Sequence, residues 1–101
     1  MILKTTTNLY DSFYRGSEYT LRAQILDENG VPFDLTGSVI KLLFHTLEKS
    51  GQIIDAPTGR VQFAFNPIDT KDIMPRAYDI TITVDSWVAL QGRLGILETN
   101  L

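Results

Sequence analysis

Apolar and polar residues alternate along much of this chain, and a period of two is typical of β-strands. The alternation is clearest over residues 77–85, where every second residue is apolar: Tyr78, Ile80, Ile82 and Val84. Residues 60–65 and 19–25 repeat it, and we expect their inward faces to consist of Val61, Phe63 and Phe65 in the first and Tyr19, Leu21, Ala23 and Ile25 in the second. The pattern therefore predicts three strands, each with one buried face.

Residues 39–45 differ, because they are apolar at every position except Lys41 and His45. A strand that is covered on both faces explains this composition, although a short helix fits the periodicity almost as well. The two β-branched residues at the start, Val39 and Ile40, favour the strand. Weaker signals predict further strands at residues 2–7, 31–33, 53–54, 87–90 and 94–99.

Turn-forming residues separate these segments at short intervals. Asn29 and Gly30 form a pair that accepts the positive φ of a tight hairpin. Residues 35–37, 50–51 and 56–59 carry similar signals. Turns that recur this often favour a sandwich or a barrel over a fold of alternating strands and helices.

One short helix is predicted near residues 67–73. Its N-terminal signals are an N-cap residue, a proline at the first helical position and an acidic residue in the first turn: Asn66, Pro67 and Asp69. Pro75 ends the helix, because the residue before a proline is disfavoured in a helical conformation. A helix this short needs tertiary contacts, so we expect Ile68 and Ile73 to pack on the sheet.

Length and composition narrow the class of protein further. At 101 residues, the chain is expected to form a single domain over residues 1–101, which buries about two-thirds of its extended surface. It has no cysteine, which excludes disulfides, cysteine-ligated zinc and thiol catalysis. A net charge of −3 argues against binding to nucleic acid or to an anionic membrane. No apolar run approaches the roughly 18 residues that span a bilayer, and we expect no signal peptide.

The sequence holds no recognisable catalytic or metal-binding motif. His45 is the only histidine, and neither Ser50 nor Ser86 lies in the glycine pattern of a nucleophile elbow. We therefore expect His45 at a strand end, hydrogen-bonded to the backbone. The carboxylates lack the spacing of an EF-hand, and the glycines form no phosphate-binding motif. We predict that the protein is not an enzyme and has no catalytic residue, metal site or cofactor.

Aromatic residues gather near the start of the chain at Tyr10, Phe13, Tyr14 and Tyr19, while Trp87 stands alone far downstream. In one interpretation, Phe13 and Tyr19 fill the core and Tyr10 and Tyr14 cover one end of it. In the others, the cluster anchors a protein interface or stacks on a sugar. The candidate interface residues are Tyr10, Phe13, Tyr14 and Trp87.

An ordered series of short motifs extends over about residues 16–84. In order, it consists of GSEYTL at 16–21, LDENGVPFDLTGSVI at 26–40, GQI at 51–53, GRVQF at 59–63, NPID at 66–69 and PRAYDITI at 75–82. This series resembles the N-terminal domain found in phage baseplate upper proteins and related tail-fibre modules. Physically, Pro32 favours an extended entry, Asp34 can accept a turn amide, and Gly37 supplies a conformation that a side chain resists.

The resemblance implies an immunoglobulin-like antiparallel β-sandwich over residues 1–101, with the one short helix near residues 67–73. It also implies a non-enzymatic structural module of a bacteriophage tail or baseplate, made in the cytoplasm of the bacterial host and carried in the virion. Its partners would be other tail or baseplate proteins and further copies of itself, with no nucleic acid and no membrane. The alternative is a carbohydrate-binding or adhesion-type β-sandwich module; a glycan ligand is possible but is not favoured.

Overall fold

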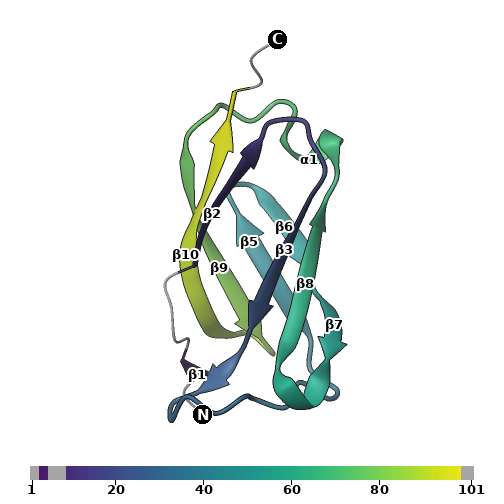
Figure 1. The fold of residues 1–101 in the computed structure, drawn as a ribbon, viewed down its shortest axis with the longest axis vertical. Coiled ribbons are helices and arrows are strands. Elements are labelled where there is room, and N and C mark those ends of the chain that lie inside the picture. The colour runs from purple at the N-terminus through teal and green to yellow at the C-terminus, as the bar shows by residue number, and fades with distance from the viewer. Residues whose placement is uncertain (1–2, 5–8, 99–101) are drawn as a thin grey trace.

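The computed structural model describes residues 3–4 and 9–98, which form two packed β-sheets (Figure 1). The larger sheet has the strand order β2-β10-β9-β5-β6, the smaller has the order β3-β8-β7, and β1 pairs with β4. The strands are β1 (Leu3–Lys4), β2 (Leu9–Tyr14), β3 (Tyr19–Gln24), β4 (Leu26–Asp27), β5 (Ile40–Phe44), β6 (Leu47–Ser50), β7 (Gln52–Asp55), β8 (Arg60–Phe65), β9 (Ala77–Val84) and β10 (Trp87–Leu97).

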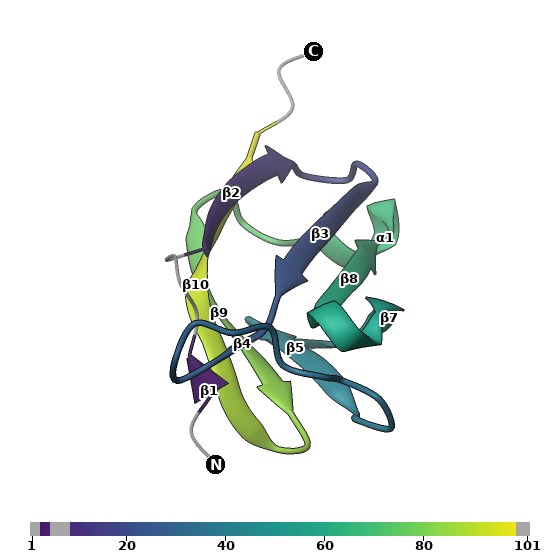
Figure 2. The same ribbon diagram turned by 60° about the horizontal axis from the view of Figure 1, so that its bottom comes forward.

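The two short helices lie at opposite ends of the sandwich. The α-helix α1 (Pro67–Thr70) lies at what we call the upper end, and the 3₁₀-helix η1 (Ala56–Thr58) lies at the lower end, as drawn in Figure 1. Figure 2 shows the two sheets facing each other across the core. The β9–β10 hairpin also lies at the lower end.

The strands predicted from alternation are confirmed. In β9, β8 and β3 the expected inward residues are buried or pack against the core, with Tyr19 and Ala23 partly buried. Strand β9 lies in the middle of the larger sheet, where Ile82 is opposite Leu42 of β5 and Leu90 of β10. Most pairs are antiparallel, as predicted, but β2 and β10 are parallel. After β2 the chain crosses to the other sheet, so β2 does not form an antiparallel hairpin with β3. It pairs instead with β10, which is distant in sequence.

Strand β5 confirms the preference for a strand over a helix, but the expectation that both faces are covered is wrong. Ile40, Leu42 and Phe44 are buried, whereas Val39 and Leu43 are 58% and 44% exposed. The sandwich has one interior, so the second apolar face of β5 lies on the outer side of the larger sheet.

Several element boundaries also differ from the predictions. Residues 87–90 and 94–99 were expected to form separate strands, but described residues 87–97 form the single strand β10, with an irregularity between Val88 and Leu90. Strands β2, β4 and β6 were not predicted. Residues 31–33 contribute only an isolated bridge between Leu26 and Pro32. Of the weak strand at 2–7, Leu3–Lys4 is a strand, and residues 2 and 5–7 lie outside the described residues, as does residue 99.

Helix α1 begins at the predicted residue but ends at Thr70 rather than near Ile73. The Asn66 N–H donates to the Asp69 carboxylate over 2.7 Å, so Asp69 caps the helix directly. Ile68 does not pack on the sheet, since 75% of it is exposed, whereas Ile73 does contact the core. The helix is instead fixed by Thr70, which is fully buried and accepts a hydrogen bond at its hydroxyl.

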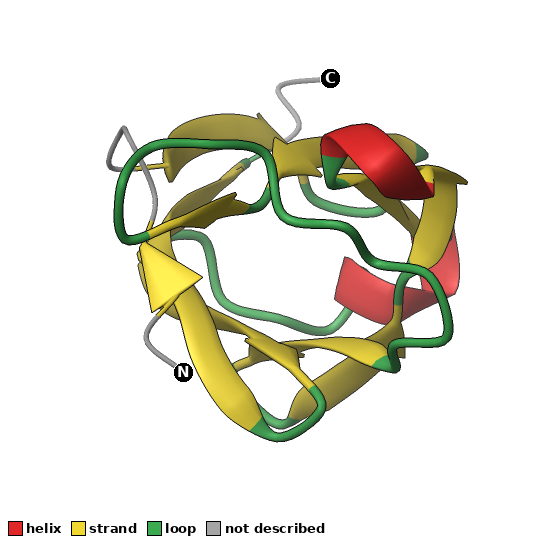
Figure 3. Ribbon diagram, turned by 90° about the horizontal axis from the view of Figure 1, so that it is seen from below, coloured by secondary structure: helices red, strands yellow, loops and turns green. Residues whose placement is uncertain are grey.

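The lower end is closed by the connection between β4 and β5, which Figure 3 shows passing across it. Backbone hydrogen bonds hold this connection: the Phe33 N–H donates to the Ile25 carbonyl, and the Leu35 N–H donates to the Ala56 carbonyl, both over 2.9 Å. Leu35 is fully buried beneath it. At Gly59 a Cβ atom would lie 2.4 Å from the Ile25 carbonyl oxygen, so only glycine fits there.

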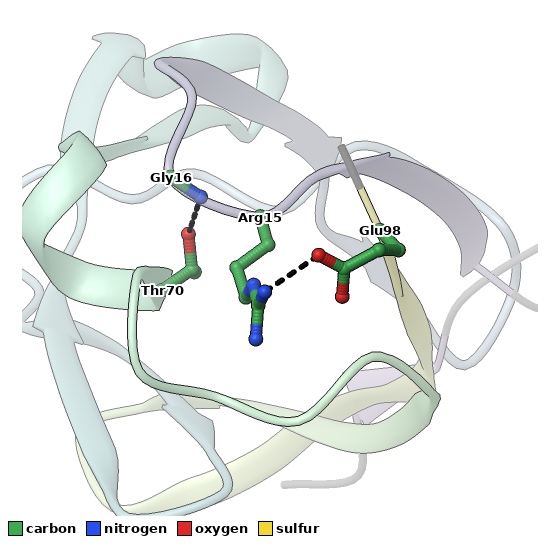
Figure 4. Close-up of polar contacts among 4 residues, drawn as sticks. All are labelled: Arg15, Gly16, Thr70 and Glu98. Atoms are coloured by element: carbon green, nitrogen blue, oxygen red, sulfur yellow. Dashed lines mark hydrogen bonds and ion pairs between the residues drawn. The ribbon is translucent and has the colours of Figure 1, made fainter. Parts of the chain in front are cut away.

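Side-chain contacts add to backbone hydrogen bonds at the upper end (Figure 4). The Gly16 N–H, in the loop between β2 and β3, donates to the Thr70 hydroxyl over 3.0 Å. The neighbouring Arg15 forms an ion pair with Glu98 at 2.6 Å. These contacts tie the loop to α1 on one side and to the end of β10 on the other.

Candidate functional site

The predicted aromatic cluster is mostly part of the core. Phe13 is 7% exposed and stacks on Tyr19, with ring centroids 4.4 Å apart and planes 6° from parallel. Both rings contact Phe65. The Tyr19 hydroxyl donates to the Asp11 carboxylate, and burial, this hydrogen bond and the Asp11 charge all raise the Tyr19 pKa. The stack therefore closes the open side between β2 and β3.

Tyr14 and Trp87 are exposed, at 54% and 58%, but they lie far apart. Tyr14 is opposite Leu97 at the upper end of β10, and Trp87 is the first residue of the same strand. At about 3.3 Å per residue, the length of β10 separates them by roughly 30 Å. The four candidate interface residues therefore do not form one surface; Tyr10 is in β2, but its side chain lies outside the described part of the structure.

Three exposed apolar residues lie around the β9–β10 hairpin at the lower end: Val39, Trp87 and Val88, which we call the lower apolar patch. They are 58%, 58% and 54% exposed. Val39 is held beside the β9–β10 hairpin because its N–H donates to the Asp85 carboxylate over 2.8 Å and its carbonyl accepts from the Asp85 N–H over 2.9 Å. Exposed apolar side chains gathered at one end of a domain, with tryptophan among them, are typical of protein interaction sites.

Of this patch, only Trp87 was among the candidate interface residues predicted from the sequence. Val39 was assigned to a doubly covered strand, and Val88 to a weak one. The available signal was the Trp87-Val88 pair that directly follows the polar Asp85 and Ser86. A hairpin turn at those two residues places the pair at the end of the sheet, where little chain is left to cover it.

The carboxylates in the recognised motif residues stabilise turns. One oxygen of Asp27 accepts the N–H groups of Asn29 and Val31. One oxygen of Asp34 accepts both the hydroxyl and the N–H of Thr36, and these two hydrogen bonds lower the Asp34 pKa. The predicted turn role of Asp34 is confirmed, and within the motif series the segment at 26–40 supplies these turns at the lower end.

His45 lies in the two-residue turn between β5 and β6, with a positive φ of 53°. Its ring packs on Tyr78, with centroids 5.0 Å apart, and lines a shallow cleft of about 510 Å³ at the upper end. Asp72 and Arg76 line the same cleft. Neither Ser50 nor Ser86 does, so the described residues bring no serine nucleophile to the histidine.

Within residues 3–4 and 9–98, neither a metal-binding cluster nor a membrane-spanning helix is found. No group of three histidine, aspartate or glutamate side chains there is placed to hold a metal ion. In the same residues, neither helix has the length and apolar character needed to cross a membrane.

No protein-family model and no curated protein sequence matches the chain. Among solved structures, the crystal structure of the Lin-41 filamin domain is similar to it, with a TM-score of 0.56 and 10% sequence identity. The similarity covers 91% of this chain and 88% of that one. Because the identity is so low, the likeness concerns the fold alone. The chain has an immunoglobulin-like β-sandwich fold, and the predicted fold class is confirmed.

Proposed function

We propose that the chain is a non-enzymatic structural module of a bacteriophage tail or baseplate, which assembles in the virion with other tail proteins and with further copies of itself. The lower apolar patch carries this proposal, because three exposed apolar side chains on a fixed backbone suit burial against a partner. The resemblance of residues 16–84 to baseplate modules supports the class of assembly. Symmetric self-association is a common way for such subunits to build larger structures.

The test is association of the purified protein with itself and with the tail proteins encoded beside it. Sedimentation velocity over rising concentration is expected to show oligomers, and Trp87→Ala with Val88→Ser is expected to abolish them. Ile68→Ser removes an apolar side chain that is 75% exposed outside the patch, so it serves as the matched control. A protein that stays monomeric at high concentration and binds none of these tail proteins contradicts the proposal.

The alternative of a carbohydrate-binding or adhesion-type module has less support. Trp87 begins β10, and Tyr14 of β2 lies beside the other end of that strand, so the two side chains do not flank one sugar ring. Binding on a glycan array that is lost with Trp87→Ala, while the fold is retained, would favour this alternative.

A further inference from the structure

The outer face of the smaller sheet carries a groove with an unusual polar composition. Its volume is about 730 Å³, and it is lined by residues 22–24 of β3, 60–62 of β8 and 52–54 of β7. Ala23, Val61 and Ile53 occupy the middle row of these three strands, so the groove runs across the strands above that row. Its two walls are formed by the flanking rows of outward-facing side chains.

Two arginines and three glutamines supply the polar part of the walls. In the register of β3 and β8, Arg22 is opposite Gln62 and Gln24 is opposite Arg60. The arginines are therefore diagonal neighbours, one on each wall, about 7–8 Å apart at the backbone. Gln52 extends the wall that contains Arg22. The Gln62 side-chain N–H donates to the side-chain carbonyl of Gln52 over 2.8 Å.

The arginines of the groove have no ion-pair partner among the described residues. Asp55 is opposite Arg60 in the register of β7 and β8, yet no ion pair joins them. The outer face of the larger sheet differs, because there Arg93 pairs with Asp79 at 3.3 Å and Lys41 with Glu48 at 3.4 Å. In a protein of net charge −3, the groove thus brings together two arginines that form no ion pair among the described residues.

We propose that this groove binds an extended, carboxylate-rich segment of a partner protein. Successive side chains of an extended chain point in opposite directions, so two adjacent acidic residues would reach Arg22 on one wall and Arg60 on the other. Arginine binds carboxylates in a bidentate manner, and glutamine amides both donate and accept, as the backbone of an extended chain requires. No aromatic ring lines the groove, which disfavours a sugar.

This inference names the partner chemistry of the assembly module proposed above and rests on that proposal for its biological setting. The binding itself is tested on the purified protein without any tail component. A failure here therefore removes the groove as a docking site, and it leaves assembly through the lower apolar patch to be judged by sedimentation.

The test is a titration followed by the amide signals of the ¹⁵N-labelled protein. The first probe is a synthetic peptide with adjacent glutamates flanked by serine and glycine. The second has the same composition, but a serine separates the glutamates, so that both carboxylates point to one wall. We expect the first peptide to shift amides of β3, β8 and β7, to bind several-fold more tightly than the second, and to weaken as salt is raised.

Substitutions assign the effect to the arginines. Arg22→Gln and Arg60→Gln are each expected to weaken binding by about twofold to fivefold, which lies within the range of an exposed ion pair. Lys71→Gln removes one positive charge from the end of α1 and is expected to leave binding unchanged. Any of four results would overturn the proposal. These are shifts confined to other strands, equal binding of both peptides, equal effects of all three substitutions, and tighter binding of polygalacturonate than of the first peptide.

Discussion

The two ends of the sandwich are closed by different means. At the lower end, backbone groups bond to backbone groups, and the chain passes so close to Gly59 that no side chain fits. At the upper end, side chains add to the backbone hydrogen bond from the Arg15 N–H to the Leu97 carbonyl: they are the Thr70 hydroxyl, the Arg15–Glu98 pair and the Lys49–Asp69 pair. The close backbone approach at Gly59 thus distinguishes the lower end, and the two ion pairs distinguish the upper end. The lower apolar patch lies at the end with the close backbone approach.

The largest expected effect comes from Gly59→Val, which places a Cβ atom within 2.4 Å of the Ile25 carbonyl oxygen and 2.8 Å of the Phe33 carbonyl oxygen. We expect a loss of more than about 4 kcal/mol in the free energy of unfolding, measured by urea denaturation. Gly37→Val is the control: Gly37 has a similar φ of 76°, but nothing lies within 4 Å of its Cβ position. Equal losses at the two glycines would mean that close packing does not define the lower end.

Leu35→Ala tests the apolar side of the same closure. Leu35 is fully buried, so its truncation is expected to lower the unfolding free energy by about 2–5 kcal/mol. Thr36→Ala, at the exposed neighbour, removes only the hydroxyl bond to Asp34 and is expected to cost about 1 kcal/mol or less. Urea denaturation measures both losses of unfolding free energy. Similar losses would show that Leu35 in the connection between β4 and β5 does not close the lower end of the core.

Thr70→Val tests the polar closure of the upper end. The change keeps the shape of the side chain but leaves the Gly16 N–H without its acceptor, so we expect a loss of about 1–3 kcal/mol. Thr70→Ser retains the hydroxyl and is expected to retain most of the stability. Hydrogen exchange at the Gly16 amide provides a local readout, which should become faster in the valine variant only.

The β9–β10 hairpin offers a gain in stability at the lower end. Asp85 and Ser86 both have positive φ, at 49° and 73°, as in the two-residue turns that prefer glycine at the second position. Ser86→Gly is therefore expected to stabilise the protein by about 1 kcal/mol, visible as a higher melting temperature. A decrease would show that the Ser86 side chain makes a contact that outweighs the backbone strain.

The smallest expected effect is the pH dependence of the upper end. Burial raises the Asp69 pKa, but the hydrogen bonds from Lys49 and the Asn66 N–H, together with the Lys49 charge, outweigh it and lower the pKa below its ordinary value. The stability that Asp69 contributes is therefore complete above the ordinary carboxylate pKa and is lost as the pH falls through the lowered value. The melting temperatures of the protein and of Asp69→Asn should differ at neutral pH and converge in acid.

Alternation alone identified β3, β8 and β9 and their buried faces, because these strands have one apolar and one polar side. It failed at β5, where Val39 and Leu43 are apolar and exposed, since a sequence does not distinguish a second core from a surface patch. It also missed the parallel pairing of β2 with β10, which joins segments far apart in the chain.

The candidate site was harder to predict than the fold. Neither the lower apolar patch nor the groove is continuous in sequence. Val39 lies beside the hairpin that carries Trp87 and Val88 only because its backbone bonds to Asp85. Arg22 and Arg60 become neighbours only through the register of β3 and β8. In the sequence the arginines are scattered and the tryptophan stands alone. Only the strand pairing shows which of these residues lie near one another.

The parallel pairing of β2 with β10 determines how the domain responds to mechanical load. The pairing begins at Leu9 opposite Gly92 and ends at Tyr14 opposite Leu97. A pull on the chain before Leu9 and after Leu97 draws the two strands past each other along their length. The hydrogen bonds between them then share the force in shear and must break together, whereas a hairpin pulled open at its ends loses its bonds one at a time.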